Sequence, residues 1–78
     1  MTRRIEILAY DAVQVLDITG PMQVFASANE QLIAAGKTAA YEIETVSAAS
    51  PVKSSSGLAL LANPLPDDVS AIDTLLVP

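Results

Sequence analysis

The feature that most constrains the fold is the stretch 5–25, with the sequence IEILAYDAVQVLDITGPMQVF. It opens with an apolar run at residues 5–10 that only Glu6 interrupts, a pattern typical of a parallel strand covered on both faces. A turn follows at Asp11, and one acidic residue, Asp17, then stands among apolar residues. Open α/β proteins build their sites from groups at the carboxyl ends of strands. The stretch therefore predicts an α/β fold with Asp17 beside a site.

A helix is expected to follow Gly20 and Pro21. Proline is favoured in the first turn of a helix because its missing N–H has no partner there. The alternative is a helix that begins near Val13 and is kinked at Pro21. Residues 22–35 carry one apolar stripe at helical spacing. The stripe consists of Met22, Phe25, Ala28 or Asn29, Leu32 and Ala35. Gly36 is expected to end the helix in a left-handed conformation.

Two further strands are expected in the same sheet. Residues 41–46 alternate between apolar and polar side chains, which predicts a strand with one exposed face or a position near the sheet edge. Strand, helix and strand then form a βαβ unit, in which the two strands are parallel and the crossover is right-handed. Residues 72–77 are almost entirely apolar and predict a central parallel strand.

A small β excursion is expected between these two strands. Short strands are predicted at 51–54 and 58–62, with a turn at 55–57. The serine-rich run 54–57 also suggests a phosphate-binding loop, but it lacks the glycine spacing and the lysine of a P-loop. A turn is the better explanation of these residues. Residues 63–70 contain two prolines and two aspartates, and predict a loop with one helical turn.

The composition bounds the class and the location of the protein. The 78 residues suffice for one small domain at most, and a hydrophobic content of 51% is too high for a disordered tail. The net charge is −5, and two of the four basic residues are Arg3 and Arg4, so no basic stripe indicates nucleic-acid binding. No run approaches the ~18 apolar residues of a membrane span, and no signal-peptide pattern is present. We therefore expect a cytoplasmic protein with no membrane partner.

Cysteine and histidine are absent from the chain. Their absence excludes a disulfide, a thiol nucleophile, an imidazole base and a zinc site of the usual Cys/His type within these residues. Two acidic pairs, Glu42 with Glu44 and Asp67 with Asp68, suggest a metal site. Neither pair has converging partners in the sequence, so solvated surface is the better explanation. We expect no metal and no cofactor in these residues.

Asp17, Thr19 and Gly20 are the candidate site residues. Asp17 is a candidate general acid or base, and its alternative role is a helix cap that accepts backbone N–H bonds. Thr19 is a candidate to line the same site, although a bond from its hydroxyl to the local backbone is the commoner role. Gly20 and Pro21 are better explained by the shape of the helix entry, where glycine permits a close backbone approach. Tyr10 is expected in the core, or at the strand end beside the site.

Three stretches carry a resemblance to a known family: LDITGPMQVF at 16–25, SSGL at 55–58 and DTLLVP at 73–78. Together with their surroundings they resemble the ThiJ/PfpI superfamily, also called class I glutamine-amidotransferase-like. Within it, the chain is most similar to the N-terminal domain of GlxA-type transcription regulators of the AraC family, and it is also similar to isonitrile hydratase. The resemblance implies a flavodoxin-like parallel sheet with helices on both faces. Residues 1–78 would be its N-terminal part, truncated on the C-terminal side, with the order β-α-β, a small β excursion and β.

The resemblance implies one of two functions. In a regulator, the domain would bind a small molecule or mediate dimerisation, and DNA would be bound only by a C-terminal domain absent from these 78 residues. In an enzyme of the isonitrile hydratase kind, a lyase, Asp17 would serve as acid or base beside a cysteine outside this chain. Asp17 matches the position of that acidic partner in the family. The chain by itself is not expected to be catalytic, and the sequence after Pro78 would separate the two functions.

Overall fold

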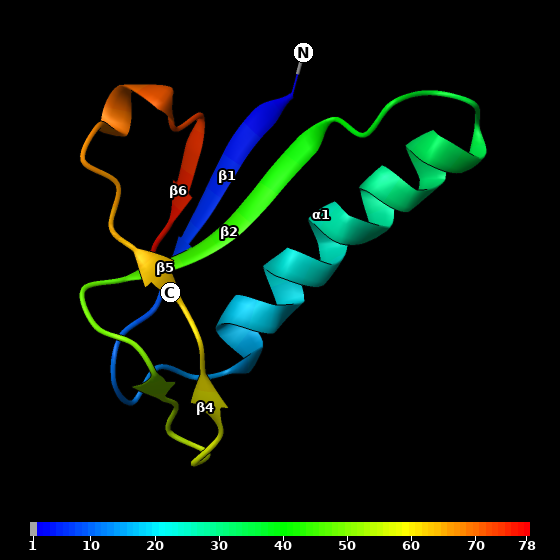
Figure 1. Cartoon of the computed structure of the whole chain (residues 1–78). Helices are drawn as coiled ribbons and strands as arrows, with labels where there is room; N and C mark the ends of the chain where they lie inside the picture. Colours follow the sequence, from blue (N-terminus) through cyan, green and yellow to red (C-terminus); the bar gives the residue numbers. More distant parts are fainter. Residues whose placement is uncertain (1) are drawn as a thin grey trace.

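β1 (Arg3–Leu8) lies inside a four-stranded parallel sheet (Figure 1). The computed structural model describes residues 2–78. β2 (Tyr41–Ser47) pairs with one side of β1, and β6 (Thr74–Leu76) pairs with the other. β5 (Asn63–Pro64) adds to the far side of β2, which gives the order β5-β2-β1-β6. The arrangement β2-β1-β6 is the start of a flavodoxin-like sheet, so the predicted α/β class is confirmed.

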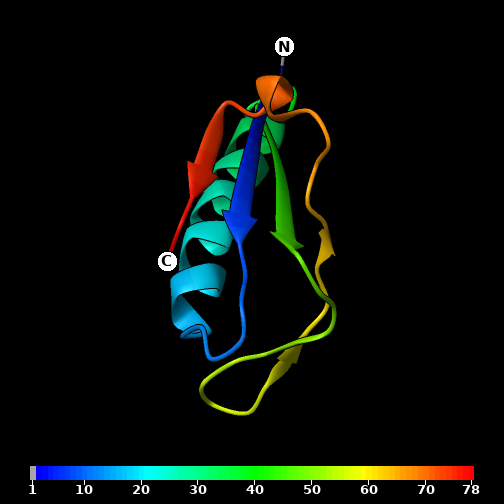
Figure 2. The same cartoon turned by 90° about the vertical axis from the view of Figure 1, so that its left-hand side faces the viewer.

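The core lies between the sheet and α1 (Leu16–Ala34), which runs along one face of the sheet (Figure 2). Ile7 in β1 is fully buried and belongs to one apolar cluster with Ile18 in α1. The parallel register pairs Ile7 with Leu76, which packs against the same cluster. Removing these aliphatic side chains from water provides the main driving force for docking the helix.

The helix starts ahead of Pro21, closer to the alternative start near Val13 than to a helix opened by Pro21. It begins at Leu16, so Pro21 lies inside it and does not open it. A proline here removes the N–H that would bond to the carbonyl of Asp17, which is unfavourable. Ile18 explains why the first turn forms nevertheless, because its side chain is only 2% exposed and anchors this turn in the core. The burial of Ile18 outweighs the cost of placing Pro21 inside the helix.

The helix ends as predicted. Gly36 has a φ of +78°, the left-handed conformation that glycine adopts without strain. Its N–H donates to the carbonyl of Ile33 at 3.0 Å, and the N–H of Lys37 donates to the carbonyl of Leu32 at 2.9 Å. This pair of bonds is the Schellman motif, which satisfies carbonyl groups at the helix end.

The two outer strands of the described sheet are β6 and β5. β6 pairs only with β1 within residues 2–78, and Leu75 is 50% exposed, so a central place for this strand stays a prediction. β5 was predicted as loop, but its two residues pair with Val46 and Ser47 of β2. Pro64 is compatible with this place because an edge strand need not donate on its outer side.

The connection between β2 and β6 contains the predicted β excursion. β3 (Val52–Lys53) and β4 (Ala59–Leu60) pair antiparallel, and the N–H of Gly57 donates to the carbonyl of Ser54 at 3.0 Å in the turn between them. The predicted helical turn is the 3-10 helix η1 (Val69–Ala71). It lies on the face of the sheet opposite α1 in both views (Figures 1 and 2). Within residues 2–78, no helix is long and apolar enough to cross a membrane.

Candidate functional site

The chain changes direction between β1 and β6. From β1 it passes through α1 to β2 on one side, and it later returns to form β6 on the other side. In open α/β sheets, ligands bind outside the carboxyl ends of the strands at such a point. A hollow of about 310 Å³ opens there. Its lining consists of Leu16, Asp17, Pro21, Leu76, Val77 and Pro78. We refer to it as the β1–β6 crevice.

Asp17 lies in the first turn of α1, and its side chain is exposed. The residue before the helix is Val15, and no side chain caps the helix N-terminus. The structure records no hydrogen bond to the Asp17 carboxylate from residues 2–78, so the alternative role of a cap is not observed. The carboxylate lies at the N-terminal end of α1, beside the β1–β6 crevice. It is therefore available to a ligand in the crevice.

Thr19 and Gly20 lie beside Asp17 but do not line the crevice. The hydroxyl of Thr19 donates to the carbonyl of Val15 at 3.1 Å, which is the local bond that the sequence suggested as its alternative role. A Cβ atom added to Gly20 would meet no other atom within 4 Å. Within residues 2–78, no close backbone approach is observed at Gly20. A ligand-binding role for either residue stays a prediction.

Tyr10 joins the segment after β1 to the segment after β6. It follows the end of β1, and its hydroxyl donates to the carbonyl oxygen of Pro78 at 2.6 Å. Its side chain is 41% exposed, so the residue lies at the strand end and not in the core. The sequence alone is compatible with a core position and with a strand-end position for Tyr10, because an aromatic residue after an apolar run fits either one.

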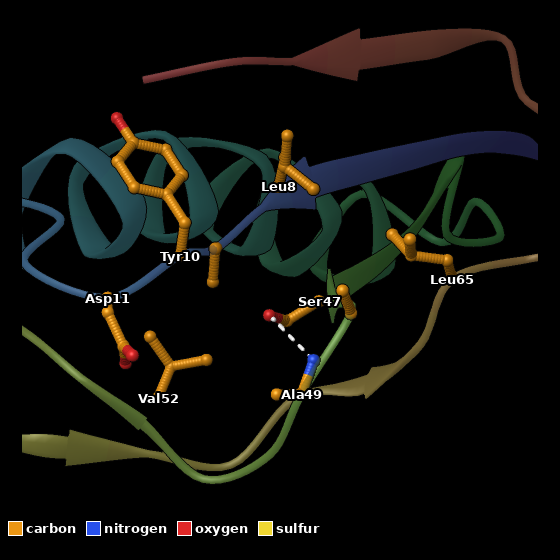
Figure 3. A pocket seen from close by; sticks show the side chains of 9 residues that line it. Leu8, Tyr10, Asp11, Ser47, Ala49, Val52 and Leu65 are labelled. Carbon is orange, nitrogen blue, oxygen red and sulfur yellow. Dashed lines mark hydrogen bonds between the residues drawn. The ribbon is translucent and has the colours of Figure 1, made fainter.

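A second hollow lies on the other side of β1, where β1 and β2 end (Figure 3). Its volume is about 330 Å³. It is lined by Leu8, Ala9, Tyr10, Asp11, Ser47, Ala48, Ala49, Val52 and Leu65. We refer to it as the β1–β2 hollow. The sequence pattern did not indicate a site at Ser47, and at Asp11 it indicated only a turn. Polar residues at the carboxyl ends of two adjacent parallel strands were the signal that would have found them.

The middle of the sheet holds a pair of acidic residues, one buried and one half-buried. Glu6 and Glu44 occupy paired positions on β1 and β2, and the Nη2 atom of Arg4 lies 3.0 Å from Glu6 and 3.2 Å from Glu44. Glu6 is fully buried, and neither of its carboxylate oxygens has a well-aligned hydrogen-bond partner among the described residues. Desolvation lowers the pKa of Arg4, but the hydrogen bond to Glu44 and the charges of both carboxylates outweigh it and raise the pKa overall.

The acidic pairs do not form a metal site. Residues 2–78 contain no group of three acidic, histidine or cysteine side chains arranged to hold a metal ion. Glu42 and Asp67 are exposed, as expected for solvated surface. Asp68 accepts hydrogen bonds from the hydroxyl and the N–H of Ser70 at 2.6 and 2.9 Å, and these bonds lower its pKa. These carboxylates thus have local structural partners or face water.

Comparison with known proteins supports the fold. No protein-family model matches the chain. A protein of Streptomyces lividans, described as an uncharacterised protein in the cpoL 5′ region, is 37% identical over 75 residues, which are 95% of this chain and 49% of that protein. The crystal structure of an AraC family transcriptional regulator from Pseudomonas putida superposes with a TM-score of 0.79 at 22% identity. The match covers 96% of this chain and 45% of the regulator. The chain thus spans about half the length of both proteins, and it shares its fold with part of the regulator.

Proposed function

We propose that the chain is the N-terminal part of a ThiJ/PfpI-like domain of a GlxA-type AraC-family transcription regulator. The observation that carries the proposal is the β1–β6 crevice, with the exposed carboxylate of Asp17, on a fold shared with an AraC family regulator. The resemblance of the stretches 16–25, 55–58 and 73–78 to this family supports the same function. A regulator of this kind acts in the cytoplasm.

In this function, the crevice binds a small-molecule signal. The Asp17 carboxylate accepts hydrogen bonds from the signal molecule, and Leu76 and Val77 supply apolar contacts. The Tyr10–Pro78 hydrogen bond holds the end of β6 beside the loop that follows β1. Ligand contacts to Leu76 and Val77 would therefore change the position of the segment that follows β6. The intact protein would form a homo-oligomer and bind DNA through a separate C-terminal domain.

The second candidate function is that of an isonitrile hydratase-like lyase. The observation that favours it is the Asp17 carboxylate, which is exposed at the crevice and has no recorded hydrogen bond within residues 2–78. Such a group is able to exchange a proton with a cysteine thiol. Because the chain contains no cysteine, the thiol would come from a segment outside these residues.

The reading frame beyond the codon for Pro78 separates the two functions. A downstream helix-turn-helix region supports the regulator. A cysteine at a strand-to-helix turn, without such a region, supports the lyase. A frame that encodes neither feature would contradict both proposals.

The role of Asp17 is tested by ligand binding in that longer protein. We expect Asp17→Asn to weaken binding of the signal molecule and the ligand-dependent change in DNA affinity, whereas Asp67→Asn, an exposed aspartate outside the crevice, changes neither. Calorimetry and DNA gel shifts give the two readouts. An Asp17→Asn protein that responds to its ligand like the parent would remove Asp17 from the site.

A further inference from the structure

The β1–β2 hollow has apolar walls and two polar side chains. We propose that it binds a small neutral molecule with an apolar body and one hydroxyl group, separately from the β1–β6 crevice. The apolar walls are formed by Leu8, Ala48, Ala49, Val52 and Leu65. A hollow of about 330 Å³ with few polar groups has the size and character of a small-molecule site.

Ser47 provides a hydrogen-bond donor to this hollow. It is the last residue of β2 and is only 6% exposed. Its oxygen accepts a long bond of 3.4 Å from the N–H of Ala49, and the structure records no acceptor for its hydroxyl proton among residues 2–78. Figure 3 shows this oxygen directed toward the side of the hollow where Asp11 and Val52 lie. A buried donor without an acceptor is unfavourable, and a ligand oxygen would satisfy it.

Asp11 provides the acceptor. One of its oxygens, Oδ1, accepts a bond of 3.2 Å from the N–H of Lys53, which leaves Oδ2 for a ligand. An ionised carboxylate only accepts hydrogen bonds, so the ligand must donate to Asp11 and accept from Ser47. A hydroxyl group is the smallest group that does both. Asp11 attracts an ammonium group, but that group has no acceptor for the Ser47 proton and leaves this buried donor unpaired. An anion would be repelled by Asp11 and by the net charge of −5.

Backbone hydrogen bonds fix the frame of the hollow. The N–H of Ala12 donates to the carbonyl of Lys53 at 2.8 Å, and the N–H of Ser55 donates to the carbonyl of Val13 at 2.9 Å. These two bonds tie the loop after β1 to β3 and to the turn that follows it. Since the walls are already in place, little ordering opposes binding.

The experiment is an NMR titration of the 78-residue chain with three probes of the same shape: cyclohexanol, cyclohexylamine and cyclohexanecarboxylate. We expect cyclohexanol to shift the amide signals of Asp11 and residues 47–49 in a saturable manner, with a dissociation constant on the order of 1 mM. The other two probes should bind at least about tenfold more weakly. Equal binding of all three would overturn the hydrogen-bonding scheme. The absence of a saturable shift, or of a dispersed amide spectrum, would overturn the site.

Variants separate the hollow from the rest of the molecule. We expect Ser47→Ala and Asp11→Asn each to weaken cyclohexanol binding about fivefold, the equivalent of one lost hydrogen bond. Ala49→Leu fills the hollow and should abolish binding. Ser27→Ala on α1 and Glu42→Gln at the other end of β2 are the matched controls and should leave the affinity unchanged. Unchanged affinity in both Ser47→Ala and Asp11→Asn would contradict the proposal. The proposal does not depend on the function of Asp17.

Discussion

The hydroxyl of Tyr10 and the carbonyl oxygen of Pro78 form a 2.6 Å hydrogen bond across the point where the sheet changes direction. Tyr10 follows β1 and Pro78 follows β6, so the bond joins two segments that are 68 positions apart in the sequence. Pro78, the acceptor of this bond, is one of the residues that line the β1–β6 crevice. The geometry of the candidate site therefore depends on one tyrosine that carries no charge.

Tyr10→Phe should lower stability by removing this bond alone. Because the side chain is 41% exposed, water replaces part of the interaction, and we expect a loss of about 0.5–1 kcal/mol. For a domain of this size, that loss lowers Tm by roughly 2–8 °C. Thermal unfolding followed by circular dichroism measures the change. Tyr41→Phe is the control, since no hydrogen bond to the Tyr41 hydroxyl is recorded among residues 2–78. Equal Tm changes in the two variants would mean that the bond contributes nothing.

Asn29→Ala should be strongly destabilising. The side-chain amide of Asn29 in α1 accepts from the N–H groups of Ala40 and Tyr41 at 3.1 and 3.0 Å, and donates to the carbonyl of Tyr41 at 2.9 Å. Its loss leaves three half-buried backbone groups unpaired at the start of β2, so we expect a cost of about 2–3 kcal/mol. Urea denaturation gives the free energy of unfolding. The control is Gln23→Ala, which removes one exposed hydrogen bond from the Gln23 amide to the Ser27 hydroxyl and should cost little. A cost for Asn29→Ala as small as that of the control would show that water replaces the three bonds.

Arg4→Met should destabilise the protein more than Arg3→Met. Arg4 lies between Glu6 and Glu44, two carboxylates at directly paired positions, whereas no ion pair is recorded for Arg3 within the described residues. Without the guanidinium, the buried Glu6 loses its counter-ion and the two like charges repel each other. The difference between the urea midpoints of the two variants measures this effect. Restoring stability by combining Arg4→Met with Glu6→Met would confirm the cause, whereas no recovery would contradict it.

Ser70→Ala should raise the pKa of Asp68 toward its ordinary value of 3.8, because the hydroxyl of Ser70 is the largest cause of the lowered pKa. A lowered folded-state pKa contributes stability above the unfolded value, and the contribution is lost as pH falls through the folded value. Wild-type protein should therefore lose this contribution below about pH 3.8, and the variant should lose less there. Carboxyl NMR titration of both proteins measures the pKa. Ser55→Ala, at an exposed turn, is the control. A wild-type pKa equal to that of the variant would show that the hydroxyl bond is absent in solution.

Local sequence signals predicted the features that depend on neighbouring residues. Gly36 ends α1 because only its own backbone conformation and the adjacent carbonyl groups are involved. The turn at Gly57 follows from the same freedom, with a φ of +92°. The apolar run around Ile7 predicted a buried parallel strand, and the alternation in residues 41–46 predicted β2. In each case, the residues that carry the sequence signal lie within a few positions of one another.

Tertiary contacts decided the features that the sequence predicted wrongly or not at all. Ile18 moved the helix start ahead of Pro21 because its burial against the sheet outweighs one lost backbone bond. The two residues of β5 became a strand only because β2 offered them an unpaired edge. For the candidate sites, the sequence by itself selected Asp17, a lone carboxylate near a strand end. Only the fold brought Tyr10 to Pro78 and Asp11 to the same hollow as Ser47, because such pairings depend on strand order, which residue spacing does not encode.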